Sequence, residues 1–244
     1  MIKKIKSKIN YGPLNKLNRE KWLELSLKQL PSGSKILDAG AGELQYQRFC
    51  KHLDYTSQDF GGYDGHGNGD ALQEGTWDND RLDIVSDITN IPVNDNTFDA
   101  VMCIEVFEHI KDPASAIKEF FRILKPGGTL ILTAPVNSLT HFAPYYFYSG
   151  FSRYWYEHYL SEAGFEIKEL IPNGNYFEYL AQEMARATSI SRNYAKTSAV
   201  VRGLFFVTII PALLMLLLIN RKNSGSENLT CFGYQIVAAK KQSK

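Results

Sequence analysis

Short apolar runs alternate with amphipathic segments along most of the chain. The first five expected strands lie at residues 35–38, 54–59, 82–87, 98–104 and 129–133, and the second of them is weaker because it is mostly polar. The run at 98–104 is almost continuously apolar, which is typical of a strand buried on both faces of a parallel sheet. Strands that alternate with helices at these lengths predict a doubly wound, mostly parallel α/β sheet.

Helices and loops are predicted between the strands from the spacing of apolar positions and from the placing of Pro and Gly. The predicted helices cover residues 13–30, 43–52, 113–124 and 152–163. The other predicted elements are an irregular loop at 60–80, a strand at 165–171, a mainly helical stretch at 174–225 and a last strand at 229–239. The sheet is therefore expected to have seven strands, with a helical, hydrophobic insert before the last one.

The length of 244 residues suits one α/β domain with additions. We expect a basic tail and a helix at 1–30, the α/β core at 31–172, the helical insert at 173–225, and the last strand of the core with a tail at 226–244. Ile2, Ile5 and Ile9 stand at helical spacing among lysines in the tail. This pattern predicts either a segment that lies on an anionic membrane or a solvated tail.

Net charge and cysteine content bear on the binding partners and the compartment of the protein. The net charge of +1 argues against a nucleic-acid partner. Cys50, Cys103 and Cys231 are an odd number without metal-type spacing, so a reducing compartment without disulfides is the simplest interpretation. Because no cluster of metal ligands is recognisable along the sequence, we predict no metal site.

The first predicted strand runs into Asp38-Ala39-Gly40-Ala41-Gly42. A Gly-x-Gly turn lets the backbone come close to a ligand, and ligands of doubly wound sheets bind beyond the carboxyl ends of the strands. A plain tight turn would use the same glycines. The third glycine of the dinucleotide fingerprint is missing and Glu43 follows instead, which disfavours a pyrophosphate and hence a nicotinamide dehydrogenase.

Two more carboxylates stand at the ends of the next strands. Asp59 can accept hydrogen bonds from both ribose hydroxyls of an adenosine ligand, or it can cap a loop turn. Asp87 can accept from an adenine amino group while Ile88 packs on the ring, or it can serve as a helix cap or loop carboxylate. Because the carboxyl ends of parallel strands meet at one edge of a sheet, these positions predict one binding site.

Five stretches, in this order, resemble the class I S-adenosylmethionine-dependent methyltransferases, within the broad group related to the ubiquinone-pathway methyltransferases. The stretches are 36–42, Asp59, 87–92, 98–109 and 124–130. The likeness extends from about residue 33 to 171, and residues 231–240 resemble the last strand of the family. It implies a Rossmann-like methyltransferase fold and S-adenosylmethionine as cofactor, and says little about the methyl acceptor.

The resemblance also implies a role for each residue at the strand ends. By this likeness, Asp38, Gly40 and Gly42 border the methionine end of the cofactor, Asp59 holds the ribose, Asp87 and Ile88 frame the adenine, and Ile104 and Glu105 close the pocket below the sulfonium. The loop after Asp59 is long and rich in glycine, so Asp64 or Asp70 is an alternative ribose ligand.

Methyl transfer from a sulfonium is an in-line displacement, in which the protein aligns the acceptor and excludes water. A hydroxyl acceptor needs a base, and His109 is our first candidate, with a packing or capping role as the alternative. His141 and His158 are the runners-up. Residues 142–159 are dense in aromatic side chains, which predicts either a cover over a flat or greasy acceptor or packing onto the sheet.

Residues 203–219 carry no charge and are flanked by Arg202 and by Arg221-Lys222. The run is short for a membrane span and contains Pro211, and the last strand has to return to the sheet. We therefore expect shallow membrane contact, with packing or a homodimer surface as the alternative. The predicted protein is cytoplasmic or peripheral at the inner face of the membrane, and methylates a small or lipid-linked acceptor on oxygen. The alternative is a non-catalytic S-adenosylmethionine-binding protein that regulates a partner.

Overall fold

The structure is a computed structural model that describes residues 14–241; the basic tail at 1–10 lies outside them. The chain divides into two compact units. Among the described residues, the unit that we call the sheet unit comprises 22–171 and 233–241. The other, the helical unit, comprises 14–21 and 172–232.

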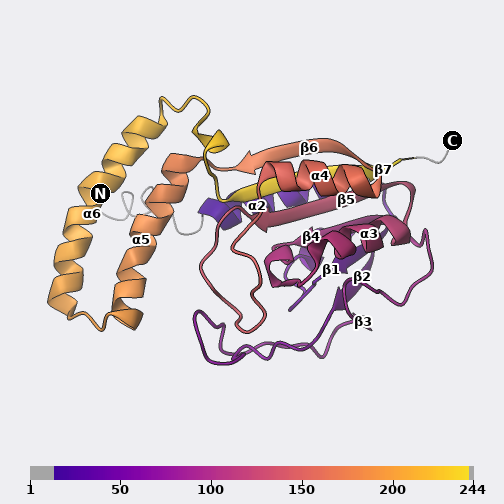
Figure 1. Ribbon diagram of the computed structural model, residues 1–244, viewed down its shortest axis with the longest axis horizontal. Helices are drawn as coiled ribbons and strands as arrows, with labels where there is room; N and C mark the ends of the chain where they lie inside the picture. Colours follow the sequence, from indigo (N-terminus) through magenta and orange to yellow (C-terminus); the bar gives the residue numbers. More distant parts are fainter. Residues whose placement is uncertain (1–13, 242–244) are drawn as a thin grey trace. The chain divides into compact units, whose positions relative to one another are not determined.

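The sheet has seven strands in the order β3-β2-β1-β4-β5-β7-β6 (Figure 1). Their bounds are β1 Lys35–Ala39, β2 Asp54–Asp59, β3 Ile84–Val85, β4 Phe98–Ile104, β5 Leu124–Pro135, β6 Phe165–Asn173 and β7 Gly233–Lys240. Strands β3, β2, β1, β4 and β5 pair in parallel, and β7 is antiparallel to β5. The predicted doubly wound, mostly parallel sheet is therefore confirmed.

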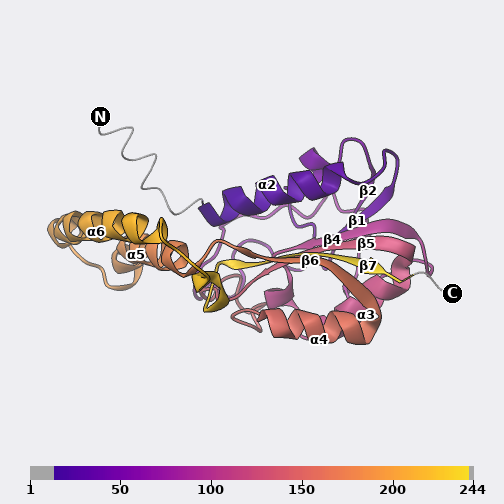
Figure 2. The same cartoon turned by 90° about the horizontal axis from the view of Figure 1, so that it is seen from above.

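Helices cover both faces of this sheet. Figure 2 shows α2 (Leu14–Lys28) along one face, with α3 (Pro113–Ile123) and α4 (Arg153–Ala163) along the other. The Asp112 side chain accepts a hydrogen bond from the backbone N–H of Ser115 at the start of α3, and α4 ends at Gly164 with φ +98°. These are ordinary start and stop signals, which is why local pattern predicted both helices to within a residue.

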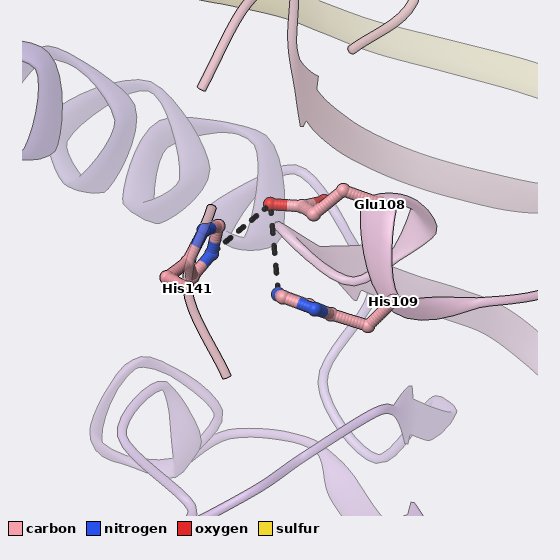
Figure 3. A group of neighbouring side chains, drawn as sticks. All are labelled: Glu108, His109 and His141. Carbon is pink, nitrogen blue, oxygen red and sulfur yellow. Dashed lines mark ion pairs between the residues drawn. The ribbon is translucent and has the colours of Figure 1, made fainter. Parts of the chain in front are cut away.

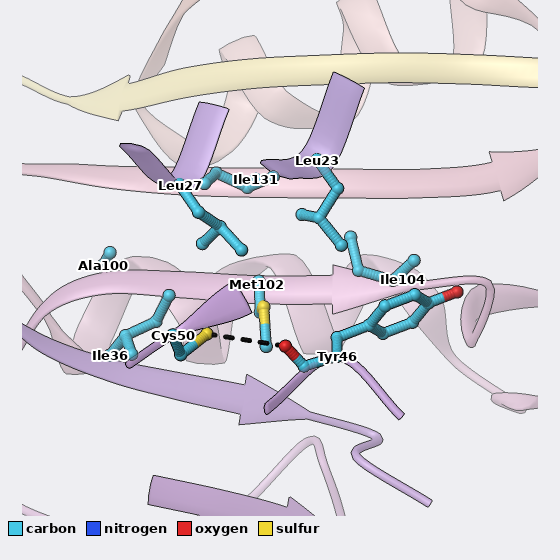
Figure 4. Packing of buried hydrophobic residues seen from close by; sticks show 9 residues of the cluster. All are labelled: Leu23, Leu27, Ile36, Tyr46, Cys50, Ala100, Met102, Ile104 and Ile131. Carbon is cyan, nitrogen blue, oxygen red and sulfur yellow. Dashed lines mark hydrogen bonds between the residues drawn. The ribbon is translucent and has the colours of Figure 1, made fainter. Parts of the chain in front are cut away.

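The core on the α2 face joins the helix to three central strands. Leu23 and Leu27 of α2 point onto β1, β4 and β5 and are fully buried (Figure 4). The other members of the cluster are Ile36, Tyr46, Cys50, Ala100, Met102, Ile104 and Ile131. This packing holds the central strands in place, so that their carboxyl ends present a fixed edge.

The predicted helix at 43–52 is wrong. The segment consists of turns and one short 3₁₀ helix, η1 (Gln47–Phe49). Backbone N–H groups bond three residues back, as from Cys50 to the carbonyl oxygen of Gln47 (3.0 Å), and Leu44 has φ +63°. Tyr46 and Cys50 still reach the core from these turns. The left-handed Leu44 stops a regular helix from starting at the glycine turn.

The predicted strand at 82–87 pairs with its neighbour only at Ile84–Val85. Before this pair, the Asp83 carboxylate accepts from the backbone N–H and the hydroxyl of Ser57 (2.8 and 2.7 Å). Hydrogen bonds of the Asp83 side chain thus replace part of the backbone pairing between β2 and β3. The pattern of apolar residues does not predict such a replacement.

The helical unit contains two long helices, α5 (Tyr176–Tyr194) and α6 (Ala199–Asn220). Ala181 of α5 packs with Ile209 and Leu213 of α6 in a small buried cluster. By length and composition alone, α6 is the one helix in the described residues that can cross a membrane. The expected helical insert is present, and α6 continues through Pro211.

Candidate cofactor and acceptor site

The turn after β1 requires glycine at two positions. Gly40 has φ +79° and Gly42 has φ +49°. A Cβ atom on Gly40 would lie 2.5 Å from a methyl carbon of Val106, and one on Gly42 would lie 2.6 Å from the ring of Trp77. Left-handed backbone and close neighbours together exclude other side chains, so this turn brings bare backbone to the edge of the sheet.

Asp59, at the end of β2, reaches the same turn. Its Oδ2 accepts a hydrogen bond from the Gly42 N–H (3.0 Å), and its Oδ1 accepts one from the Gly61 N–H (3.1 Å). Burial raises the pKa of this carboxyl, and the backbone bonds oppose the rise. Gly42, which follows β1, and Asp59, which ends β2, are thus in direct contact at the edge of the sheet.

The two alternative carboxylates do not reach the turn. Asp64 is exposed and accepts from the N–H groups of His66 and Gly67 (both 2.9 Å). Asp70 is exposed and accepts from the Asn68 side chain (3.0 Å). Both stabilise their own loop, so Asp59 is the carboxylate that the structure brings to the glycines.

Asp38 lies in the interior beneath the turn. Its side chain accepts a hydrogen bond from the Tyr55 hydroxyl (2.7 Å), and the residue is 1% exposed. Burial raises the pKa of Asp38 to about 7, against the lowering effect of the Tyr55 hydroxyl. Its carboxyl is thus engaged within the protein, while Gly40 and Gly42 form the turn above it.

At the next strand end, Asp87 is exposed and accepts from the N–H and the hydroxyl of Thr89 (both 2.8 Å). This is the geometry of a loop carboxylate, in which Oδ1 holds the turn. Ile88 is 8% exposed, so its side chain is mostly covered.

The end of β4 departs from ordinary backbone geometry. Ile104 is buried, and Glu105 has φ +58°, which is uncommon for a residue other than glycine. The Glu105 side chain accepts from the Thr133 hydroxyl of β5 (2.8 Å), and its N–H donates to the Thr133 carbonyl (2.9 Å). These two bonds hold the left-handed residue at the edge of the sheet.

The three histidines separate clearly. His109 and His141 meet, with ring centroids 4.6 Å apart, beside the carboxylate of Glu108 (Figure 3). Burial, reinforced by His141, lowers the pKa of His109 to about 4, against the raising effect of the Tyr145 carbonyl. His158 instead lies exposed on α4, 3.4 Å from Glu162, so the structure places it on the surface.

Sequence reasoning missed the aromatic side chains of the irregular loop after β2. Tyr63 and Trp77 contact Phe142 from the loop after β5, with centroids 4.6 and 5.4 Å apart. Two backbone bonds join the loops: Phe142 N–H to Leu72 O (2.9 Å) and Asn68 N–H to Ala143 O (3.0 Å). Through Trp77, the joined loops cover the glycine turn. In the sequence, the one hint of this contact was a tryptophan within a Gly-rich segment.

The aromatic stretch at 142–159 divides between two surroundings, and its predicted role as a cover over the acceptor stays a prediction. Phe151 and Trp155 pack on the buried ring of Phe107, with centroids 6.1 and 5.9 Å apart. Phe142 lies instead against the His109 ring (5.2 Å) and the loop after β2. The later rings therefore belong to the core, and the earlier one belongs to the site.

A family match falls on these same elements. Residues 37–132 match the family described as a methyltransferase domain. The range holds the glycine turn, Asp59, Asp87 and the end of β4. It confirms the resemblance found in the sequence.

Curated relatives align with half of the chain or less. The ubiquinone biosynthesis O-methyltransferase of Xanthomonas axonopodis pv. citri is 30% identical over 124 residues, which is 50% of this chain and 51% of that protein. The tRNA (carboxymethyluridine(34)-5-O)-methyltransferase of Arabidopsis thaliana is 30% identical over 118 residues, 46% of this chain and 27% of that protein. The chain thus spans about half the length of these relatives, or less. We expected from the near-neutral charge that nucleic acid is not a partner. Because one of these relatives is named for tRNA, that exclusion is not supported.

Solved structures share the whole fold at low identity. Phosphoethanolamine N-methyltransferase 2 of Haemonchus contortus, in complex with phosphomonomethylethanolamine and S-adenosylhomocysteine, has a TM-score of 0.51 and 18% identity, over 91% of this chain and 53% of that one. The cyclase SpnF has a TM-score of 0.53 and 19% identity, over 93% of this chain and 81% of that one. At these identities the likeness shows the fold.

Proposed function

We propose that this chain, which carries a class I methyltransferase domain at residues 37–132, transfers the methyl group of S-adenosylmethionine to the oxygen of a small or lipid-linked acceptor. The observation that carries the proposal is the contact between Gly42 and Asp59 at the carboxyl edge of the parallel sheet, inside the matched range. In doubly wound sheets this edge is where ligands bind.

The residues present fit an adenosine-containing cofactor. The Asp59 carboxylate accepts from the backbone N–H groups of Gly42 and Gly61, and the N–H of Phe60 also bonds to it. A carboxylate has about four acceptor sites, so capacity is left for a ribose hydroxyl. Gly40 and Gly42 expose backbone without Cβ atoms, which suits close approach of the methionine end. Asp87 offers a carboxylate oxygen to an adenine ring, whereas the mostly covered Ile88 offers a small apolar surface.

When bound, S-adenosylmethionine supplies a methyl group activated by the positive sulfonium. The chain itself has to orient the acceptor and keep water away. The joined loops at 60–80 and 136–152 serve the second purpose, because Tyr63, Trp77 and Phe142 form an apolar cover beside the glycine turn.

We take His109 to lie beside the acceptor, although its lowered pKa makes it a weak base. A pKa of about 4 means that its ring is neutral at pH 7 and has little tendency to take a proton from a hydroxyl. The prediction that it is the general base stays a prediction, tested by the loss of turnover in His109→Ala with cofactor affinity kept. The choice of oxygen as the methylated atom is supported by the two curated relatives, both of which are named for O-methylation.

A membrane-bound acceptor is supported by the surface of α6. Ten of its large apolar side chains are between 39% and 72% exposed, including Leu204, Val207 and Leu218. We estimate roughly 900 Å² of uncovered apolar area, against about 300–600 Å² for the largest patch of a typical soluble monomer. A helix that is apolar all round needs a partner that covers it.

We take this partner to be an anionic lipid surface. The helix carries no charge between Arg202 and Arg221, and Lys222 adds a second cation at its end. Cations at both ends of an apolar helix match lipid headgroups, each contributing about 1 kcal/mol near an anionic surface. Both ends of the insert continue into strands of one sheet, so contact with one leaflet fits the chain better than a single crossing. This arrangement would place the enzyme at the cytoplasmic face of a membrane.

Calorimetric titration with S-adenosylhomocysteine tests the proposed cofactor site. We expect micromolar binding to the wild type and at least tenfold weaker binding to Asp59→Asn, which keeps the size of the side chain and loses its charge. Asp64→Asn, an exposed carboxylate of the adjacent loop, is the matched control and should bind as the wild type does. A folded wild-type protein that binds no S-adenosylhomocysteine would contradict the proposal. Binding without methyl transfer to any lipid extract would favour the regulatory alternative.

Flotation with phosphatidylglycerol vesicles tests the lipid contact. We expect the wild type to float, the double variant Val207→Glu/Leu218→Glu to stay in the dense fraction, and Leu229→Glu to float. Leu229 is the control because it is 81% exposed and lies outside α6. A wild type that stays in the dense fraction, or a stable dimer in lipid-free buffer that the double variant dissociates, would overturn the lipid proposal.

A further inference from the structure

Three electron-pair donors converge beside the site described above, from two separate loops. Glu108 and His109 belong to the 3₁₀ helix η2 (Phe107–His109) after β4, and His141 belongs to the loop after β5. The Glu108 Oε1 lies 3.9 Å from Nε2 of His109 and 3.9 Å from Nε2 of His141 (Figure 3). One ligand atom from each residue lies within 4.8 Å of the other two.

The hydrogen bonds of the rings determine which nitrogen faces the carboxylate. The His109 Nδ1 lies 2.6 Å from the carbonyl oxygen of Tyr145, and the His141 Nδ1 lies 2.8 Å from that of Leu139. A carbonyl oxygen only accepts, so each Nδ1 carries the hydrogen and the Nε2 of a neutral ring carries a lone pair. Metal-binding histidines show this same arrangement, with the remote nitrogen bonded to a carbonyl or carboxylate oxygen.

The geometry between His109 and Glu108 suits a cation. The Glu108 side chain is 2% exposed, so water would screen little of its attraction for a cation placed beside it. The His109 Nε2 is buried and has no hydrogen-bond partner in the described part of the chain. A lone pair that faces a carboxylate oxygen at 3.9 Å is repulsive unless something positive lies between the two atoms.

We propose that Glu108, His109 and His141 bind a divalent transition-metal ion of the Zn²⁺ class. Two imidazoles and one carboxylate form a donor set that zinc uses in catalytic sites, with a fourth position left open. At the usual Zn–N and Zn–O distances of about 2.0–2.1 Å, tetrahedral ligand atoms stand about 3.4 Å apart. The two 3.9 Å separations from the Glu108 oxygen therefore need about half an ångström of closure each, and the histidine ligand atoms, within 4.8 Å of each other, also have to approach.

The cover loops hold His141 in position for this role. Leu72 and His141 form an isolated parallel bridge, in which the Leu72 N–H bonds to the Thr140 oxygen (3.3 Å) and the Phe142 N–H bonds to the Leu72 oxygen (2.9 Å). The Phe142 ring also lies against both imidazoles, with centroids 5.2 and 5.0 Å away. His141 lies in a loop, and the backbone bonds to Leu72 and the packing of the Phe142 ring hold it in place.

An open fourth position would suit the oxygen of an acceptor. The charge of the ion lowers the pKa of a hydroxyl bound to it, so the hydroxyl can lose its proton near neutral pH without a strong base among the side chains. This role of the site rests on the proposed O-methylation, whereas the metal binding itself does not.

Equilibrium dialysis of the metal-stripped full chain against Zn²⁺, and Co²⁺ titration followed by visible absorption, test the proposal without any activity assay. We expect one ion per wild-type chain with micromolar or tighter affinity. His141→Ala and His109→Ala should each weaken binding at least tenfold. His158→Ala, which removes an exposed histidine beside Glu162, is the matched control and should bind as the wild type does.

S-adenosylhomocysteine titration of each variant shows whether the fold and the cofactor site survive. Metal binding lost in His141→Ala, with S-adenosylhomocysteine affinity kept, supports the site. A wild type that binds no ion, or a folded His141→Ala that binds Zn²⁺ with wild-type affinity, overturns it. Metal binding that depends on His141 in a protein that binds no S-adenosylhomocysteine would leave the metal site standing and refute the proposed function.

Discussion

The buried carboxyl of Asp38 makes the stability of this protein depend on pH in an unusual direction. Burial raises its pKa from 3.8 to about 7, although the Tyr55 hydroxyl donates to it. Between these values the folded chain holds a proton that the unfolded chain has lost. The free energy of unfolding therefore falls as pH rises through this window, and the stabilisation is fully present only below pH 3.8.

The magnitude follows from the width of the window. Each pH unit between the two pKa values changes the free energy of unfolding by about 1.4 kcal/mol. Raising the pH from about 5 to about 8 crosses roughly two such units, so this group alone should cost about 3 kcal/mol of stability. Asp38→Asn does not titrate, and its amide oxygen still accepts from Tyr55.

Urea unfolding of the wild type and Asp38→Asn at the two pH values measures this effect. We expect the variant to gain about 3 kcal/mol relative to the wild type on going to the higher pH. Asp80→Asn removes the same charge from an exposed loop position and should show no such gain. If the difference between Asp38→Asn and the wild type does not change with pH, the carboxyl is ionised in the folded protein and the reasoning is refuted.

Three further substitutions test the turn, a buried cation and the core. Gly42→Ala should weaken S-adenosylhomocysteine binding at least tenfold in calorimetry, because its Cβ would lie 2.6 Å from the Trp77 ring on left-handed backbone. Lys240→Met should lower the free energy of unfolding in urea by about 2–3 kcal/mol, since its Nζ donates to three oxygen atoms within 2.8 Å. Leu23→Ala should lower it by about 3 kcal/mol, because it leaves a cavity under α2.

Neighbouring positions provide the controls. Gly69→Ala also meets left-handed backbone but has nothing within 4 Å of its Cβ, so it should keep cofactor affinity. Lys241→Met and Leu25→Ala change exposed residues and should shift stability by less than about 0.5 kcal/mol. Equal effects at a test position and its control would contradict the explanation offered for that position.

Local pattern was sufficient wherever burial alone decides the structure. The strand Phe98–Ile104 was predicted at its exact bounds, because a strand covered on both faces has to be apolar throughout. Helix α3 was predicted because Pro113 is a strong start signal, and the structure adds the cap made by the Asp112 side chain. At residues 43–52, local pattern failed because Leu44 is held in a left-handed conformation next to the glycine turn.

The sheet, the glycine turn and the strand-end position of Asp59 could be predicted from residue order alone, since the carboxyl ends of parallel strands meet at one edge. The contact of Asp59 with Gly42, which Asp64 and Asp70 do not make, depends on how the long loop after β2 turns and is visible only in the fold. The same holds for the meeting of His141 with Glu108 and His109. Spacing along a chain records helices and strands, but a contact between two loops depends on the backbone bonds that join them, and no periodicity encodes those bonds.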